Sequence, residues 1–467
     1  MSLGMSLGVR ERELALSSTA PAIDVSWIDE FIDRVRPYVF VRAADNLIIK
    51  RPNQAQKLNA QGVAVLEKLL SGMTIGDLLD EIGREPEKVR DVHLFLFEIK
   101  RFLEGTLDEL TRTSAVDVQP FEMRFSRLPV LSEVAITYRC NLRCSFCYAG
   151  CNCTTNPVGD DREMTTDEVF EVLRAIRQDA QVPSVSFTGG EPTLREDLPE
   201  LVSNAQAQGM RVNLITNGTR ITDEMARRLA AAGLDSAQVS LEGVTAATHE
   251  LVTGVRHSFG RTLAGIHHLK RAGVAVHTNT TINRDSLTEC PAMPRFVKHE
   301  LGNDRFSMNL VIPTGSAALN ARLVVRYSEL GPHLSSIAAE SKRHDVEFMW
   351  YSPTPMCLFN PVAEGLGNKG CSACEGLLSV GANGDVIPCA SYDEVVGNVL
   401  ERNVLEVWES DRAEQFRDKF LAHPQCRTCA DFQVCNGACP LYWRHMGFGE
   451  LIDQNRFHPV RREHFDQ

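Results

Sequence analysis

The chain has 467 residues, of which 43% are hydrophobic and 24% are charged, so it can bury several cores, and we expect two to four domains. Its formal net charge of −12 argues against sequence-independent binding to nucleic acid or to an anionic membrane. No stretch approaches the roughly 18 apolar residues of a membrane span, and the N-terminus lacks the apolar segment of a signal peptide. We therefore expect a cytoplasmic protein, whose 14 cysteines indicate metal ligation or catalysis rather than structural disulfides.

The first 130 residues contain no cysteine and predict a separate N-terminal module. "PYVFVRAADNLIIKRP" reads as two short strands around a turn. Three helices are then predicted in "NAQGVAVLEKLLSG", in "TIGDLLDEIG" with Thr74 as its cap and Gly83 at its end, and in "EPEKVRDVHLFLFEIKRFLEG". A strand pair followed by three helices is a winged-helix pattern. We assign residues 1–25 to a tail, 26–110 to this domain and 111–130 to a linker.

From residue 131 to residue 315, strands alternate with helices, as in a parallel sheet built from βαβ units. The expected strands are "VAITY", "PSVSFTG", "RVNLITNG", "SAQVSLEG", "AVHTNTTI" and "RFSMNLVIP". Six units predict an α/β fold, a partial (β/α)6 barrel, in which the loops after the strands hold the chemistry. A bridge over 316–356 and a cysteine-rich domain over 357–467 complete the chain.

The loop after the first expected strand contains three cysteines in the spacing C-x-x-x-C-x-x-C: Cys140, Cys144 and Cys147. Thiolates so close together can hold an iron–sulfur cluster or a zinc ion. Either would normally take four ligands, so three leave one position open for substrate or cofactor. A structural zinc site is the alternative.

With Phe146 before the last cysteine, this loop resembles the signature of radical S-adenosylmethionine enzymes. The resemblance implies that the three thiolates hold a four-iron, four-sulfur cluster whose fourth iron is chelated by S-adenosylmethionine. An electron from such a cluster cleaves the cofactor to a 5′-deoxyadenosyl radical, which abstracts a hydrogen atom from substrate. Phe146 would lie near the adenine.

A second motif, Gly189-Gly190-Glu191-Pro192, follows the second expected strand and matches the loop that binds the amino end of the cofactor in the same family. Glycines allow close approach of the backbone, and a carboxylate accepts charge-assisted hydrogen bonds from an ammonium. The resemblance also places other cofactor contacts at strand ends: Thr216, Asn217, Ser240 and Asn279. A simple turn is the alternative for Thr216 and Asn217.

The C-terminal cysteines resemble the SPASM extension of radical enzymes, which holds two auxiliary iron–sulfur clusters. The resemblance implies one auxiliary cluster on Cys371, Cys374, Cys389 and Cys439. It implies a second on Cys426, Cys429 and Cys435. With the cluster that binds the cofactor, the chain would hold three four-iron clusters; a zinc-ribbon-like site is the alternative.

The final cysteine of the SPASM pattern is absent, which leaves the second auxiliary cluster one ligand short. This cluster would either keep an open iron or take a fourth ligand. The candidate ligands are Cys357, from earlier in the chain, and His445, Asp453 and His458, from the C-terminal segment. Cys151 and Cys153 lie outside the radical-enzyme motif, and we expect them to be free thiols.

The N-terminal module resembles the peptide-recognition domain of enzymes that modify ribosomally made peptides, where it binds a leader segment by strand addition. We therefore expect a maturase that oxidatively forms a thioether or carbon–carbon cross-link in a peptide, with flavodoxin or ferredoxin as electron donor. A small-molecule substrate (a sugar, a porphyrin or a cofactor precursor) is the alternative, and a non-enzymatic electron carrier is the alternative of another class. Spacing alone does not select a catalytic base.

Overall fold

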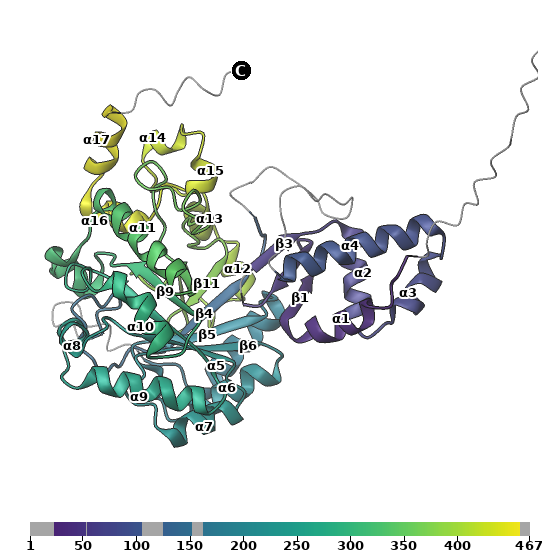
Figure 1. Cartoon of the computed structure of the whole chain (residues 1–467), viewed down its shortest axis with the longest axis horizontal. Coiled ribbons are helices and arrows are strands. Elements are labelled where there is room, and N and C mark those ends of the chain that lie inside the picture. The colour runs from purple at the N-terminus through teal and green to yellow at the C-terminus, as the bar shows by residue number, and fades with distance from the viewer. Residues whose placement is uncertain (1–22, 53, 105–124, 152–161, 458–467) are drawn as a thin grey trace, which may run out of the picture. The chain divides into compact units, whose positions relative to one another are not determined.

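The computed structural model describes residues 23–52, 54–104, 125–151 and 162–457 (Figure 1). The predicted linker over 111–130 and the tail over 1–25 therefore lie mostly outside the described residues. The chain divides into two compact units, one of residues 1–41 and 57–117, the other of residues 42–56 and 118–467. All the predicted site residues belong to the second unit.

The N-terminal region contains one helix more and one strand more than the sequence predicts. Its helices are α1 Ile28–Val35, α2 Ala60–Leu70, α3 Ile75–Ile82 and α4 Pro86–Glu104. Its strands, β1 Val39–Arg42, β2 Leu47–Lys50 and β3 Gln54–Lys57, form a sheet in the order β1-β2-β3. The three predicted helices are confirmed as α2, α3 and α4, and Thr74 caps α3 by accepting from the Asp77 N–H. The polar β3 lacks the apolar alternation that marks a strand, so the sequence gives no signal for it.

Ten strands of the second unit form one sheet in the order β10-β9-β8-β7-β6-β5-β4-β11-β12-β13. Their bounds are β4 Leu131–Thr137, β5 Ser184–Gly189, β6 Arg211–Thr216, β7 Ser236–Ser240, β8 Ala275–Ile282, β9 Arg305–Leu310, β10 Glu347–Trp350, β11 Leu377–Val380, β12 Asp385–Ile387 and β13 Gly397–Asn398. Strands from β10 to β11 along this order pair in parallel, whereas β12 and β13 add antiparallel. The predicted α/β fold is confirmed, and its six predicted strands are β4 to β9.

One face of this sheet is apolar and packs against helices. Buried side chains on that face alternate along each strand, as the two-residue period of a strand requires: Val134, Ile136, Val185, Phe187, Val212, Leu214, Ala237 and Val239. The helices that follow the strands are α5 Thr166–Arg174, α6 Leu198–Ala207, α7 Asp223–Ala231, α8 Ala246–Thr253, α9 Ser258–Arg271, α10 Met293–His299 and α11 Tyr327–Arg343. Short 3-10 helices occupy Arg36–Tyr38, Pro192–Leu194, Cys290–Ala292, Gly315–Leu319 and Ala321–Leu323, and a π-helix extends α5 over Ala175–Asp179.

The opposite face of the same strands is polar. Strand register aligns Glu133, Ser186, Asn213, Ser236 and the residues that follow them on this face, which we call the polar face. Hydrogen bonds join neighbouring strands across it, for example from Asn213 Nδ2 to Ser186 Oγ at 3.2 Å and from Ser236 Oγ to Asn213 Oδ1 at 2.7 Å. A polar face on a parallel sheet suits a ligand site better than a packed core.

The C-terminal region consists of short helices: α12 Val404–Trp408, α13 Asp411–Arg417, α14 Pro424–Arg427, α15 Phe432–Cys435, α16 Pro440–Met446 and α17 Gly449–Phe457. Aromatic packing fixes it to α11, since the rings of Tyr327 and Tyr442 lie 4.1 Å apart between centroids. The Tyr442 hydroxyl also accepts from the Tyr327 N–H at 3.1 Å and donates to Glu450. Within the described ranges, we find no helix with the length and apolar character of a membrane span.

Candidate functional site

The loop of residues 140–147, the cysteine loop, follows β4 directly and is held by backbone hydrogen bonds to the end of α8. The Arg143 N–H donates to the Thr253 carbonyl at 2.9 Å and the Ser145 N–H to the Val252 carbonyl at 3.0 Å. Gly254, with φ +68°, closes α8, and a Cβ there would lie 2.6 Å from the Arg143 oxygen. The loop is therefore positioned by the main chain.

The three thiols of the cysteine loop gather with two buried carboxyl groups. Burial raises the pKa of Cys144 well above its usual value, and Glu242, Cys147 and Cys140 raise it further. Burial likewise raises the pKa of Cys140 to about 11, with Glu191 and Cys147 contributing. Hydrogen bonding with Cys151 instead lowers the pKa of Cys147 to about 6. A bound metal would ionise the thiols of Cys140 and Cys144, so the three cysteines fit an iron–sulfur cluster.

Gly189 and Gly190 fit against the end of β4. A Cβ on Gly189, whose φ is +125°, would lie 2.0 Å from the Thr137 carbonyl oxygen, and a Cβ on Gly190 would lie 2.3 Å from that of Arg139. Instead, the Gly190 N–H donates to Thr137 and the Glu191 N–H to Arg139, both at 2.8 Å. The glycines thus bring the second motif beside the cysteine loop.

Glu191 is fully buried and joins the ends of β5 and β6. Its carboxylate accepts from the Thr193 N–H and hydroxyl, from the Thr216 hydroxyl at 2.7 Å and from the Asn217 N–H at 2.8 Å. Asn217 Nδ2 in turn donates to Asn141 Oδ1 in the cysteine loop at 2.9 Å. Glu191, Thr216 and Asn217 are therefore connected to the three cysteines, and their contact with the cofactor stays a prediction.

The other predicted cofactor contacts are distributed around the same end of the sheet. Ser240 is the last residue of β7, and Pro192 is buried in the 3-10 helix after Glu191. Phe146 is partly exposed within the cysteine loop. Asn279 lies in β8, where its amide donates to Asn309 at 2.7 Å and accepts from the Ser307 hydroxyl at 2.9 Å.

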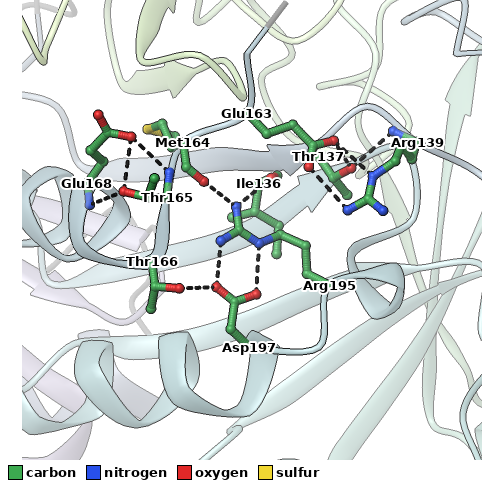
Figure 2. Close-up of polar contacts among 10 residues, drawn as sticks. All are labelled: Ile136, Thr137, Arg139, Glu163, Met164, Thr165, Thr166, Glu168, Arg195 and Asp197. Carbon is green, nitrogen blue, oxygen red and sulfur yellow. Dashed lines mark hydrogen bonds and ion pairs between the residues drawn. The ribbon is translucent and has the colours of Figure 1, made fainter.

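Arg195 is a structural residue of this site that our sequence reasoning missed (Figure 2). Its guanidinium donates to the carbonyls of Ile136 at 3.1 Å and Met164 at 2.7 Å, and it pairs with Asp197 through two hydrogen bonds. Thr166, at the start of α5, donates to the same Asp197 at 2.8 Å. Since the guanidinium is almost fully buried, this network fixes the end of β4 against α5. The sequence signal for this role is the charged run Arg195-Glu196-Asp197, which three residues separate from Glu191.

The first C-terminal set, Cys371, Cys374, Cys389 and Cys439, comes together from three segments. Burial raises the pKa of Cys389 well above its usual value, and the neighbouring thiols of Cys371 and Cys439 raise it further. Burial raises the pKa of Cys374 to about 12, and the neighbouring Cys371 also raises it. An open hollow of about 350 Å³ borders Cys371 and the turn before Cys439.

Two buried cations border this first set. Lys419 Nζ donates to the Cys371 carbonyl at 2.7 Å and pairs with Glu375. Arg417 donates to the Cys374 carbonyl at 3.0 Å. Both cations lie among thiols whose charge, once they bind iron, would be negative, so the residues present fit an anionic cluster.

The second C-terminal set, Cys426, Cys429 and Cys435, lies in the short helices α14 and α15 and the turn between them. Burial raises the pKa of Cys426 to about 11, and the nearby thiols of Cys435 and Cys429 contribute to this rise. Three consecutive residues after Cys435 have left-handed backbone, with φ of 56°, 73° and 66°, although only Gly437 favours it. Hydrogen bonds from the N–H groups of this turn to the Cys435 thiolate oppose the rise of its pKa that burial causes.

No three His, Cys, Asp or Glu side chains of the described residues gather as closely as one metal ion requires. A four-iron cluster is larger than one ion, and its thiolates stand correspondingly further apart. Of the two thiols expected to be free, Cys151 lies against Cys147 and the two thiols share hydrogen bonding. Cys153 and His458 lie outside the described residues.

Glu133 lies near Tyr148, which directly follows the cysteine loop, and near Cys389 of the first C-terminal set. It lies on the polar face of β4, where its carboxylate accepts from the Ser379 hydroxyl and from the Ala390 N–H at 3.2 Å, next to Cys389. Burial raises the pKa of Glu133 above its usual value. Burial also raises the pKa of Tyr148, with further contributions from Glu133 and Cys151. A carboxyl group thus stands between the two cysteine regions.

The chain matches two known domain families at these positions. Residues 134–289 match the Radical SAM superfamily, and residues 371–430 match an iron–sulfur cluster-binding domain named SPASM. The predicted recognition of both domains is confirmed. The chain therefore contains a Radical SAM domain and a C-terminal SPASM domain and is an enzyme, so the electron-carrier alternative is set aside.

Relatives of two kinds resemble the chain in sequence. An "AdoMet-dependent heme synthase" of Methanosarcina barkeri is 29% identical over 331 residues, covering 66% of this chain and 90% of that protein. A "PqqA peptide cyclase" of Streptomyces rochei is 28% identical over 331 residues, covering 66% of this chain and 83% of that protein. The relatives share an enzyme class and differ in the kind of substrate that their names state.

In fold, the chain resembles Streptococcus suis SuiB, whose structure was solved with its precursor peptide SuiA. The TM-score is 0.62 at 17% identity, covering 87% of this chain and 95% of SuiB. Residues 125–467 make up less than 87% of the chain. The likeness in fold therefore includes part of the N-terminal region. The two sequence relatives cover a smaller share of the chain.

Proposed function

We propose that this enzyme is a maturase that oxidises a ribosomally made peptide or small protein and forms a thioether or carbon–carbon cross-link in it. One observation supports this most: Glu133 on the polar face lies beside both the cysteine loop region and Ala390, which follows Cys389. A substrate on this face would meet a site that removes hydrogen and a site that accepts an electron.

The reaction removes two hydrogens from the substrate, the first as an atom and the second as a proton and an electron. When bound, the cluster on Cys140, Cys144 and Cys147 and S-adenosylmethionine supply the 5′-deoxyadenosyl radical that takes the hydrogen atom. The first C-terminal set would hold a cluster able to accept the electron left by bond formation, and flavodoxin or ferredoxin would supply the reducing electron that starts each turnover.

Glu133 is the proton acceptor of this proposal. It lies on the polar face, where it pairs with Ser379 across β4 and β11, and its carboxylate accepts hydrogen bonds from the Ser379 hydroxyl and the Ala390 N–H. Its raised pKa makes the carboxylate a stronger base than an exposed glutamate. The hydrogen bond from the Ala390 N–H also holds the carboxylate near Cys389, the preceding residue.

A peptide substrate is supported by two likenesses. The fold resembles SuiB over most of its length, including part of the N-terminal region, and SuiB was solved with a precursor peptide. The peptide cyclase of Streptomyces rochei resembles the chain in sequence. We assign leader-peptide binding to the N-terminal domain, three four-iron clusters to the chain and the cytoplasm as the place of reaction.

A small molecule is the second candidate substrate, because the heme synthase of Methanosarcina barkeri resembles the chain as closely as the peptide cyclase does. An oxidation of a porphyrin precursor would use the same removal of hydrogen and the same electron acceptor. Glu133 would serve either substrate.

The experiment is co-expression of the enzyme with each small open reading frame adjacent to its gene, followed by intact-mass measurement of the peptides. We expect one peptide to lose about 2 Da, corresponding to two hydrogens, with the wild-type enzyme and not with Cys144→Ala. Oxidation of a porphyrin precursor together with unchanged masses of all the peptides would contradict the peptide proposal and favour the second candidate.

A further inference from the structure

The second C-terminal set supplies three thiols, one fewer than a fully ligated iron–sulfur cluster needs. Cys426, Cys429 and Cys435 lie within ten residues of one another, and residues 440–467 contain no cysteine. A fourth ligand among the described residues would therefore come from another segment; without one, the cluster has an iron that a substrate can reach.

The chain segment after β10 lies against this set. The Met356 N–H donates to Cys435 Sγ at 3.4 Å, which brings the backbone of residue 356 to the sulfur itself. The segment turns there, since the N–H groups of Leu358 and Phe359 donate to the Pro355 carbonyl at 2.9 and 3.1 Å. Cys357 stands in the middle of this turn.

The surroundings of the Cys357 thiol are the three cysteines of the second set. The thiols of Cys435, Cys426 and Cys429 lie close enough to the Cys357 thiol to interact with its charge. Four thiols beside one another, three of them partly buried and Cys429 exposed, would repel one another as thiolates, and bound iron is the cation that removes this repulsion.

The other candidates for the fourth ligand lie in less suitable positions than Cys357. His445 and Asp453 are both exposed, and no hydrogen bond described in this structure joins either side chain to the second set. Cys290, the other isolated cysteine, is buried against Ser286, where its thiol donates to the carbonyl at 3.4 Å.

We infer that Cys357 is the fourth ligand of the second auxiliary cluster, which it completes with Cys426, Cys429 and Cys435. This rests on the proposal that the chain holds auxiliary clusters, and it departs from the SPASM pattern, in which the last ligand follows the others in sequence. A shell of four thiolates leaves no iron open to substrate, so this cluster transfers electrons. The ligand also fixes the chain after β10 to the cysteine-rich region.

The test uses the full-length chain with Cys140, Cys144 and Cys147 all changed to Ala, so that only auxiliary clusters remain. Into this background we place Cys357→Ala, with Cys290→Ala as the matched control. After anaerobic reconstitution, iron and sulfide are counted, and the clusters are identified by Mössbauer and electron paramagnetic resonance spectroscopy. No substrate or cofactor is needed.

We expect roughly eight irons in the background and in Cys290→Ala, corresponding to two four-iron clusters. Cys357→Ala should lose about half of this iron or convert one cluster to a three-iron form, and Cys357→Ser should retain more iron. Eight irons without a three-iron signal in Cys357→Ala, or that signal in His445→Ala or Asp453→Ala instead, would overturn the inference. Fewer than roughly eight irons in the background itself would show that the failure lies in the proposed auxiliary clusters and not in Cys357.

Discussion

The cysteine loop and the C-terminal cysteines represent two ways of building a metal site. Cys140, Cys144 and Cys147 lie in one loop, which the backbone of α8 holds in place. The first C-terminal set comes from segments as far apart as Cys371 and Cys439, and buried Lys419 and Arg417 border it. The first site is therefore readable from spacing, whereas the second depends on how distant segments pack.

The largest expected effect separates the two sites functionally. Cys439→Ala should abolish formation of the oxidised product because the first C-terminal set loses a ligand. Mutating a residue that only hydrogen-bonds to a metal ligand lowers activity by about 10- to 100-fold, and loss of the ligand itself should lower it further. Cleavage of S-adenosylmethionine should continue, since the cysteine loop is intact. The measurement is 5′-deoxyadenosine against product, and loss of both activities in Cys439→Ala would show that the two sites do not work independently.

Glu133→Gln tests the residue between the two sites. We expect product formation to fall by about 10²- to 10⁴-fold, the usual contribution of a positioned base. Cleavage of S-adenosylmethionine should remain near the wild-type rate. The control is Ser379→Ala, which removes one hydrogen bond to the carboxylate and leaves the base in place. Equal losses in Glu133→Gln and Ser379→Ala would point to a packing role for Glu133.

Arg195→Ala tests how the structure around the cysteine loop is held. Removing this guanidinium leaves Asp197 without its charged partner and removes the hydrogen bonds to the Ile136 and Met164 carbonyls, so we expect about 3–5 kcal/mol of destabilisation. Arg139→Ala is the matched control, because its ion pair with Glu163 is largely exposed and should be worth about 0–1 kcal/mol (Figure 2). Urea unfolding of both variants measures the difference, and equal losses would contradict a special role for Arg195.

The smallest effect concerns pH and His277 on the polar face. Burial, followed by Arg305 and Arg211, lowers the pKa of His277 to about 4, below its value of 6.5 in the unfolded chain. The unfolded chain therefore binds the proton first, and the contribution of His277 to stability, complete above pH 6.5, is lost as pH falls toward 4.

Between pH 7.5 and pH 5.5 this loss should be about 1 kcal/mol, and His277→Gln should remove it. Urea midpoints at both pH values measure the change, with the exposed His257→Gln as control. The same pH dependence in His277→Gln as in the wild type would show that other groups cause it.

Elements with local signals could be predicted from the sequence. The apolar runs of β4 to β9, the Thr74 cap and the cysteine loop each follow from neighbouring residues. The extent of the sheet could not be predicted, because β11 pairs with β4 although Leu377 and Leu131 are far apart in sequence. The partners of Glu133, and the turn that brings Met356 to Cys435, depend in the same way on tertiary packing.

The central claim is that the cysteine loop holds a catalytic cluster and the C-terminal sets hold auxiliary ones. The most direct measurement is iron per chain together with 5′-deoxyadenosine formed from S-adenosylmethionine, in the reduced, anaerobically reconstituted wild type and in Cys144→Ala. We predict roughly twelve irons and cleavage in the wild type, and roughly eight irons without cleavage in Cys144→Ala. Bound zinc, or no cleavage in either protein, would contradict the claim.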